Sequence, residues 1–219
     1  MKPSRYLSIP AVVLAAGLVI SLQAQDVLTV GEVSAKPGEK VSGFIHVPAG
    51  KDGPETRIPV TLIRGTRPGP VLALIAGVHA CEYASILGLQ RVNLELKPDQ
   101  VSGSVILVLV AHPEAFFKRI PYYNPVDWKN MNRQFPGDPE GTMSQRIAWA
   151  IRTQVLDRCD ALVDNHGGDA NEDLAPFVFC AETGEQTLDG KVRALANVYG
   201  IPIVECEKLS PGSSPRYAS

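Results

Sequence analysis

Residues 71–112 read VLALIAGVHACEYASILGLQRVNLELKPDQVSGSVILVLVAH, and this stretch decides the fold. Its two ends, residues 71–78 and 104–112, are continuous apolar runs, which are typical of strands covered on both faces. Between them, residues 82–96 place apolar side chains at helical spacing. Strand, helix and strand in this order predict a βαβ unit. We therefore expect an α/β fold with a mixed, largely parallel sheet flanked by helices.

The rest of the chain extends this pattern on both sides. Residues 27–64 are rich in Val, Ile and Thr and are broken by KPGEK and PAGKDGPE, which predicts short strands joined by turns. Residues 113–142 form a long aromatic loop, and loops of this length in a compact domain are usually functional or disordered. After it we expect a helix, two strands, a helix and a final strand, over residues 143–158, 159–169, 175–182, 188–200 and 201–208.

The N-terminus resembles a secretory signal peptide. Lys2 and Arg5 precede a 14-residue apolar stretch, Ile9–Leu22, and Ala24 lies at a plausible cleavage point. The stretch is short for a membrane span, which needs about 20 residues, although an uncleaved anchor is the alternative. We expect a periplasmic or secreted protein with no stable membrane span after cleavage. Its parts are then a signal peptide, a β-rich segment and one enzyme domain, at residues 1–24, 25–56 and 57–219.

Charge and cysteine content narrow the function further. The formal net charge is −2 and no run of five like charges occurs, so we expect no nucleic-acid partner. An exported chain can form disulfides, and its four cysteines allow three pairings, among which the sequence does not choose. We expect at least two of them to stay free. No CxxC motif is present, which argues against a cysteine zinc site.

Two histidines follow buried strands directly, and this placement suggests a metal site. In open α/β sheets, ligands bind beyond the carboxyl ends of the strands, where His79 and His166 lie. Glu82 falls at the expected start of the next helix, so two imidazoles and a carboxylate would form the His₂Glu set of a catalytic zinc. The alternative is a helix-starting glutamate beside a hydrogen-bonded histidine. His112 also follows a strand and competes as a ligand, whereas His46 reads as a surface residue.

Three segments match a known family in order and spacing. AGVHACEYASILGLQRV, HPEAFFKRIPYYNPVDWKNMNRQFPG and LVDNHGGD resemble the succinylglutamate desuccinylase/aspartoacylase family, zinc-dependent deacylases related to the zinc carboxypeptidases. The resemblance runs from about residue 57 to the end of the chain. It implies a zinc carboxypeptidase-like fold. It also implies hydrolysis of an amide bond in a small N-acyl amino acid or peptide that carries a carboxylate.

The resemblance also implies roles for particular residues. His79, Glu82 and His166 would be the zinc ligands, a set of imidazoles and a carboxylate that suits Zn²⁺. In the aromatic loop, Arg133 would hold the substrate carboxylate, Asn132 beside it would also bind the substrate, and Arg119 would polarise the scissile carbonyl. A guanidinium suits the first task because it can grip a carboxylate with two parallel hydrogen bonds.

Asp164 is a further candidate, from position alone. It precedes His166 by two residues and so lies on the same side of the strand, where it could support that ligand or simply end the strand.

The chain departs from the family pattern at three places. Ala80 stands where glycine is usual, and Asn130 stands where the family has an acid, which affects how Arg133 is oriented. The family's general base is a glutamate on a strand that follows a segment like PGSSPRYAS, in which this chain stops at Ser219. We therefore expect a domain truncated at its C-terminus, with the base absent.

The absent base leaves a second function open, a metal-binding or ligand-binding module without catalysis. A cysteine amidase using Cys81 and His166 is a weaker alternative, because His166 has a better role as a ligand.

Overall fold

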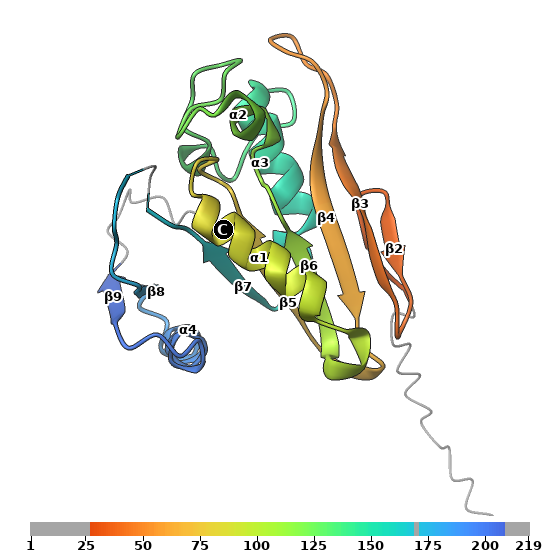
Figure 1. Cartoon of the computed structure of the whole chain (residues 1–219), viewed down its shortest axis with the longest axis vertical. Helices are drawn as coiled ribbons and strands as arrows, with labels where there is room; N and C mark the ends of the chain where they lie inside the picture. Colours follow the sequence, from red (N-terminus) through yellow and green to blue (C-terminus); the bar gives the residue numbers. More distant parts are fainter. Residues whose placement is uncertain (1–26, 169–170, 209–219) are drawn as a thin grey trace, which may run out of the picture.

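The computed structural model describes residues 27–168 and 171–208 (Figure 1). Its strands are β1 (Leu28–Val30), β2 (Val33–Ala35), β3 (Lys40–Val47), β4 (Thr56–Arg64), β5 (Arg67–Ala76), β6 (Ser102–Val108), β7 (Ala161–Asn165), β8 (Val178–Glu182) and β9 (Val204–Lys208). Its α-helices are α1 (Tyr83–Glu95), α2 (Pro113–Lys118), α3 (Met143–Gln154) and α4 (Gln186–Val198), and its 3₁₀ turns are η1 (Pro98–Gln100), η2 (Met131–Arg133) and η3 (Leu156–Arg158). The proposed signal peptide lies outside the described residues.

A mixed five-stranded sheet in the order β3-β4-β6-β5-β7 forms the centre of the molecule. The β5–α1–β6 unit is confirmed, since β5 pairs in parallel with β6 on one side and with β7 on the other. β3, β4 and β6 are joined by antiparallel pairings. The expected mixed α/β fold flanked by helices is therefore confirmed. The β-rich N-terminal segment contributes β3 to this same sheet.

Apolar side chains cover both faces of the sheet. Alternate residues of β6 point to opposite faces, because successive side chains of a strand do so. On one face Ile106 joins the core that contains Ile147 and Ile151 of α3. On the other face Leu107 joins a core that contains Ile86 of α1. Two-sided burial explains why the strands read as continuous apolar runs rather than as alternating ones.

Three features differ from, or add to, the predicted elements. The aromatic loop is not wholly irregular, since it contains the six-residue helix α2, which begins at Pro113, and the turn η2. β8 and β9 form a separate parallel pair, next to α4, and a disulfide joins Cys180 to Cys206 at paired positions. The disulfide leaves out Cys81 and Cys159.

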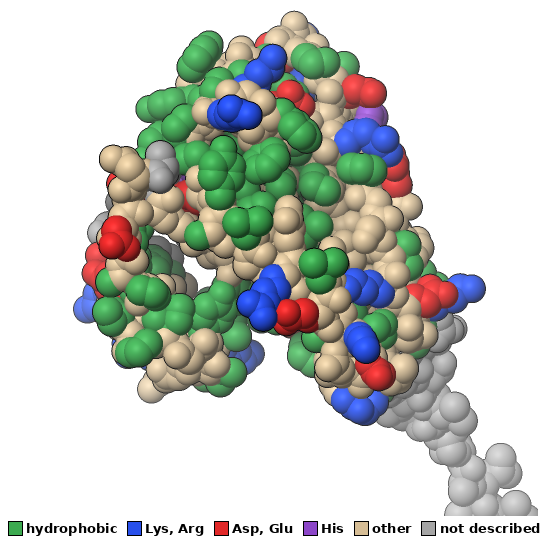
Figure 2. Space-filling view, in the orientation of Figure 1, with side chains coloured by type: hydrophobic (Ala, Val, Ile, Leu, Met, Phe, Trp, Pro, Cys, Tyr) green, Lys and Arg blue, Asp and Glu red, His purple; other side chains and the backbone are tan. Residues whose placement is uncertain are grey.

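The surface gives two further observations. Figure 2 shows hydrophobic side chains gathered over α1 and α2, where Tyr83, Leu87 and Phe117 are exposed. Among the helices in the described ranges, none combines the length and the hydropathy that crossing a membrane requires.

Candidate metal centre

The pairing of β5 with β7 brings the two candidate histidines to one edge of the sheet. The last residues of these parallel strands, Ala76 and Asn165, are register partners. His166 follows β7 directly, and His79 lies in the short turn that leads from β5 to α1. Glu82 is the residue immediately before α1. His79 and Glu82 therefore both lie in the turn between β5 and α1.

Glu82 lies between the two imidazoles and contacts both. Its Oε1 is 2.9 Å from Nδ1 of His79, and its Oε2 is 2.8 Å from Nδ1 of His166. One ligand atom from each of the three residues can be chosen so that all lie within 4.8 Å of one another. The Glu82 side chain is only 4% exposed, and Oε2 also accepts a hydrogen bond from the Gly167 N–H. The carboxylate is thus fixed in place within a compact donor set.

Each imidazole has a further partner on its other nitrogen. Nε2 of His166 is 2.7 Å from Oδ2 of Asp164, and Nε2 of His79 is 3.3 Å from Oδ1 of Asn130. The ring of Tyr122 meets the His79 ring edge-on, with the centroids 5.1 Å apart. Both rings therefore turn the same nitrogen, Nδ1, toward Glu82, and both turn Nε2 away from it toward a second partner.

The electrostatics of the three groups favour a bound positive charge. Burial alone raises the pKa of Glu82, but hydrogen bonds with His166 and His79 outweigh it and lower the pKa to about 2. Burial alone lowers the pKa of His166, but hydrogen bonds with Asp164 and Glu82 outweigh it and raise the pKa to about 10. Both shifts favour a positive charge beside the Glu82 carboxylate.

The same groups suit a metal ion. Two imidazole nitrogens and a buried carboxylate oxygen within 4.8 Å of one another are the donor types of the His₂Glu zinc sites. A divalent cation binding there would displace any proton on these ligand atoms, because a metal ligand must offer a lone pair.

The residues expected to bind substrate all lie in the aromatic loop, at the end of α2 and in η2. Asn132 is buried in η2, and its side-chain oxygen has no hydrogen-bond partner among the described residues. The Arg133 side chain is exposed, and its Nη1 donates to the Asn132 carbonyl at 3.1 Å. Arg119 ends α2 in a left-handed conformation, with φ 57°, and is also exposed. The substrate-binding roles of these three residues stay predictions.

Two aspartates that the sequence reading did not single out anchor two loops to the start of α3: Asp127 anchors the aromatic loop, and Asp52 anchors the β3–β4 turn. Oδ2 of Asp127 accepts from the Ser144 N–H and Oδ1 from the Ser144 hydroxyl, both at 2.8 Å. Asp52, from the β3–β4 turn, accepts from the Met143 N–H at 2.8 Å. An acid can satisfy the free N–H groups at the start of a helix. Asp127 and Asp52 are 17 and 91 positions from their partners in α3, so the sequence near the helix start does not reveal them.

The other two histidines stand outside the cluster. His46 pairs with Glu55 at 3.0 Å on the surface, as expected. His112 is completely buried at the start of α2, and burial lowers its pKa to about 4. It is not among the three grouped ligands.

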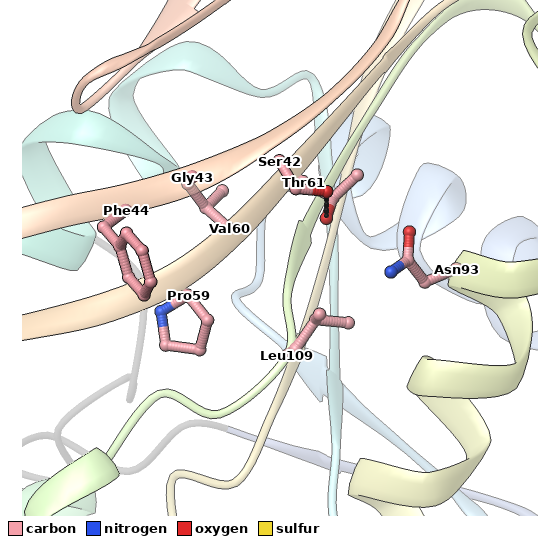
Figure 3. A pocket seen from close by; sticks show the side chains of 8 residues that line it. All are labelled: Ser42, Gly43, Phe44, Pro59, Val60, Thr61, Asn93 and Leu109. Atoms are coloured by element: carbon pink, nitrogen blue, oxygen red, sulfur yellow. Dashed lines mark hydrogen bonds between the residues drawn. The ribbon is translucent and has the colours of Figure 1, made fainter.

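A surface hollow of about 240 Å³ is also separate from the cluster (Figure 3). It is lined by Ser42, Gly43, Phe44, Pro59, Val60, Thr61, Asn93 and Leu109.

Known proteins are similar to this chain in sequence and in fold. The family model of the succinylglutamate desuccinylase/aspartoacylase catalytic domain matches residues 68–218. An N-alpha-acetyl-L-2,4-diaminobutyric acid deacetylase from Halomonas elongata is 31% identical over 174 residues, which cover 75% of this chain and 50% of the relative.

Solved structures agree with these matches. An aspartoacylase family protein from Mesorhizobium loti superposes with a TM-score of 0.72 at 28% sequence identity. The match covers 78% of this chain and 54% of the Mesorhizobium loti protein. A metallo-carboxypeptidase from Burkholderia cenocepacia has the same fold, with a TM-score of 0.58 at 19% identity, covering 81% and 51%. The chain thus spans about half the length of the relatives it matches, and it belongs to the succinylglutamate desuccinylase/aspartoacylase family.

Proposed function

We propose that this protein is a zinc-dependent hydrolase that cleaves an amide bond in a small N-acyl amino acid or peptide. The observation that carries the proposal is the grouping of His79, Glu82 and His166 at the edge of the sheet, with ligand atoms within 4.8 Å of one another. Membership of a deacylase family supports the amide bond as the target. The similarity to a deacetylase that acts on an N-acetylated amino acid supports a substrate of that size.

His79, Glu82 and His166 would hold the zinc ion. The chemistry that zinc supplies in such a set is Lewis acidity, toward a carbonyl oxygen and toward water. Hydrogen bonds with the two imidazoles keep the Glu82 carboxylate ionised although it is buried, and these contacts also keep it from rotating. Asp164 and Asn130 hold the outer nitrogens of the two rings.

The aromatic loop would bind the substrate. We propose that Arg133 grips the substrate carboxylate and that the side-chain oxygen of Asn132 accepts a hydrogen bond from the substrate. Arg119 would approach the scissile carbonyl. The free oxygen of Asn132 supports this, because a buried polar atom without a partner has an unmet hydrogen-bonding requirement that a ligand can satisfy. The exposed side chain of Arg133 is able to reach a ligand.

We also propose that the protein acts in the periplasm or outside the cell. The disulfide between Cys180 and Cys206 supports this, because disulfides persist in oxidising compartments.

The test measures bound zinc and amide hydrolysis with the full-length natural protein and a panel of N-acetyl amino acids. Glu82→Gln should lose both zinc and hydrolysis, because it removes the shared anionic ligand. The matched control is Glu55→Gln, which alters a His–Glu pair on the surface and should change neither. Hydrolysis that persists after chelation and in Glu82→Gln would contradict the proposal. Stoichiometric zinc without hydrolysis of any amide would instead favour a binding module.

A further inference from the structure

The two imidazoles of the cluster have chemically different partners behind them. His166 has a carboxylate, Oδ2 of Asp164, at 2.7 Å from Nε2, whereas His79 has an amide, Oδ1 of Asn130, at 3.3 Å. A metal-binding histidine is oriented by the group that accepts the hydrogen bond of its other ring nitrogen. The difference between the two partners therefore bears on how each ring is held.

The orientation of the Asn130 amide is fixed by a second contact. Its Oδ1 lies 2.9 Å from the backbone nitrogen of Asn132, which can only donate a hydrogen bond. The oxygen, and not the NH₂ group, must therefore occupy this position and face His79. Since an amide oxygen can only accept, Nε2 of His79 must carry the hydrogen. Nδ1 is then the nitrogen left to bind a metal, and it lies 2.9 Å from Oε1 of Glu82.

Backbone hydrogen bonds hold Asn130 in place. It precedes the turn η2, its carbonyl accepts from the Arg133 N–H at 3.0 Å, and it forms a bridge with Tyr123 that closes the loop between them. That loop is fastened to α3 through Asp127. An acceptor on such a support is preorganised, because it does not need to be ordered when the metal binds.

We infer that Asn130 is a positioning residue that holds His79 with Nδ1 ready for the metal, and that it does so without adding a negative charge. The inference rests on the proposed function, because it concerns the same metal. Among the residues that the structure describes, the carboxylates that contact the two rings are then Glu82 and Asp164, whose two charges balance one divalent cation. An aspartate in place of Asn130 would give a third.

The test titrates the metal-free chain with zinc against a competing chelator, in three variants. Asn130→Ser keeps an oxygen that can cap η2, since serine and asparagine are similar in that role, but it is too short to reach His79. We expect it to bind zinc about 10- to 100-fold more weakly. Asn130→Asp keeps both contacts and adds a charge, so we expect tighter binding. Asn124→Ser is the matched control, because Asn124 is a buried asparagine of the same loop whose Oδ1 accepts from Val126.

A second measurement follows the ring directly. In ¹⁵N spectra of the zinc-loaded chain, assigned with His79→Gln, the His79 ring should carry its hydrogen on Nε2 and bind zinc through Nδ1. Zinc on Nε2 would overturn the inference. So would equal affinities for Asn130→Ser, Asn124→Ser and the unaltered chain, which would show that Asn130 only caps the turn. If the unaltered chain binds no zinc at all, the proposed function fails as well, so the two failures are distinguishable.

Discussion

Replacing Asp52 with alanine should destabilise the protein by leaving a buried guanidinium without its counter-ion. Oδ1 of Asp52 lies 2.6 Å from Nη1 of Arg146, and the Arg146 side chain is only 5% exposed. Nε and Nη2 of Arg146 have no hydrogen-bond partner among the described residues, while Nη1 also donates to the Gly141 carbonyl. Asp52 therefore supplies most of what compensates this charge for its loss of hydration.

The size of the effect follows from two losses. Removing one partner of a buried ion pair costs about 3–5 kcal/mol. Losing the carboxylate that accepts from the Met143 N–H, at the start of α3, costs about 1 kcal/mol more. Because the Asp52 side chain is 28% exposed, solvent screens part of the pair, and we expect about 3 kcal/mol in total.

The assay is urea unfolding of the metal-free chain at neutral pH, followed by far-ultraviolet circular dichroism. The double variant Asp52→Ala/Arg146→Met separates the two losses, because methionine fills the space without a charge. It should lie only about 1 kcal/mol below the unaltered chain, the contribution of the missing cap. A loss below about 1 kcal/mol for Asp52→Ala, or a double variant as unstable as the single one, would refute the reasoning.

Three more predictions follow. Burial alone raises the pKa of Asp52, but hydrogen bonds from Arg146 and Met143 outweigh it and lower the pKa below 3.8, so its stabilisation is present at neutral pH and is lost as acid protonates it. The difference in unfolding free energy between the unaltered chain and Asp52→Asn should therefore be constant near neutral pH and shrink as pH falls below 3.8, and a difference that stays constant in acid would contradict this. Cys180 and Cys206 are 26 positions apart, and replacing both with serine removes the disulfide that closes this loop in the unfolded chain. The free energy of unfolding, measured in urea, should fall by about 3.5 kcal/mol. An unchanged value would show that the reduced chain keeps these strands together. Zinc at about 1,000 times its dissociation constant should stabilise the fold by about 4 kcal/mol, seen as a higher melting temperature. Glu82→Gln should lack this shift, and an equal shift in that variant would place the zinc elsewhere.

Local sequence patterns predicted the β5–α1–β6 unit well, because burial on both faces leaves an unbroken apolar run and helical spacing marks α1. They did not reveal that β4 lies between β3 and β6, since the order of strands in a sheet is set by distant pairings. α2 was also missed. It is only six residues long and begins at Pro113 in a stretch of mixed composition, too short to show a helical period.

The same division holds for the candidate site. The structure brings together His79, Glu82 and His166, which were predicted from strand ends and from the family resemblance. The sequence marked Asn130 only as a departure from the family pattern. Its contact with His79 joins residues 51 positions apart and depends on the conformation of the aromatic loop. Residue types at strand ends can be read locally, whereas the acceptors that orient them cannot.

The separation of the two imidazoles depends on the register between β5 and β7. Because side chains alternate along a strand, a slip of one residue would put Asn165 where His166 lies and turn the imidazole to the other face of the sheet. Asn165 opposes such a slip, since its Nδ2 donates across to the Ile75 carbonyl at 3.0 Å and its Oδ1 accepts from the Tyr199 hydroxyl at 2.6 Å. Asn165 is not one of the three grouped residues, yet it holds the strand that carries His166. The geometry of the candidate site therefore depends on this side chain as well as on the three grouped ones.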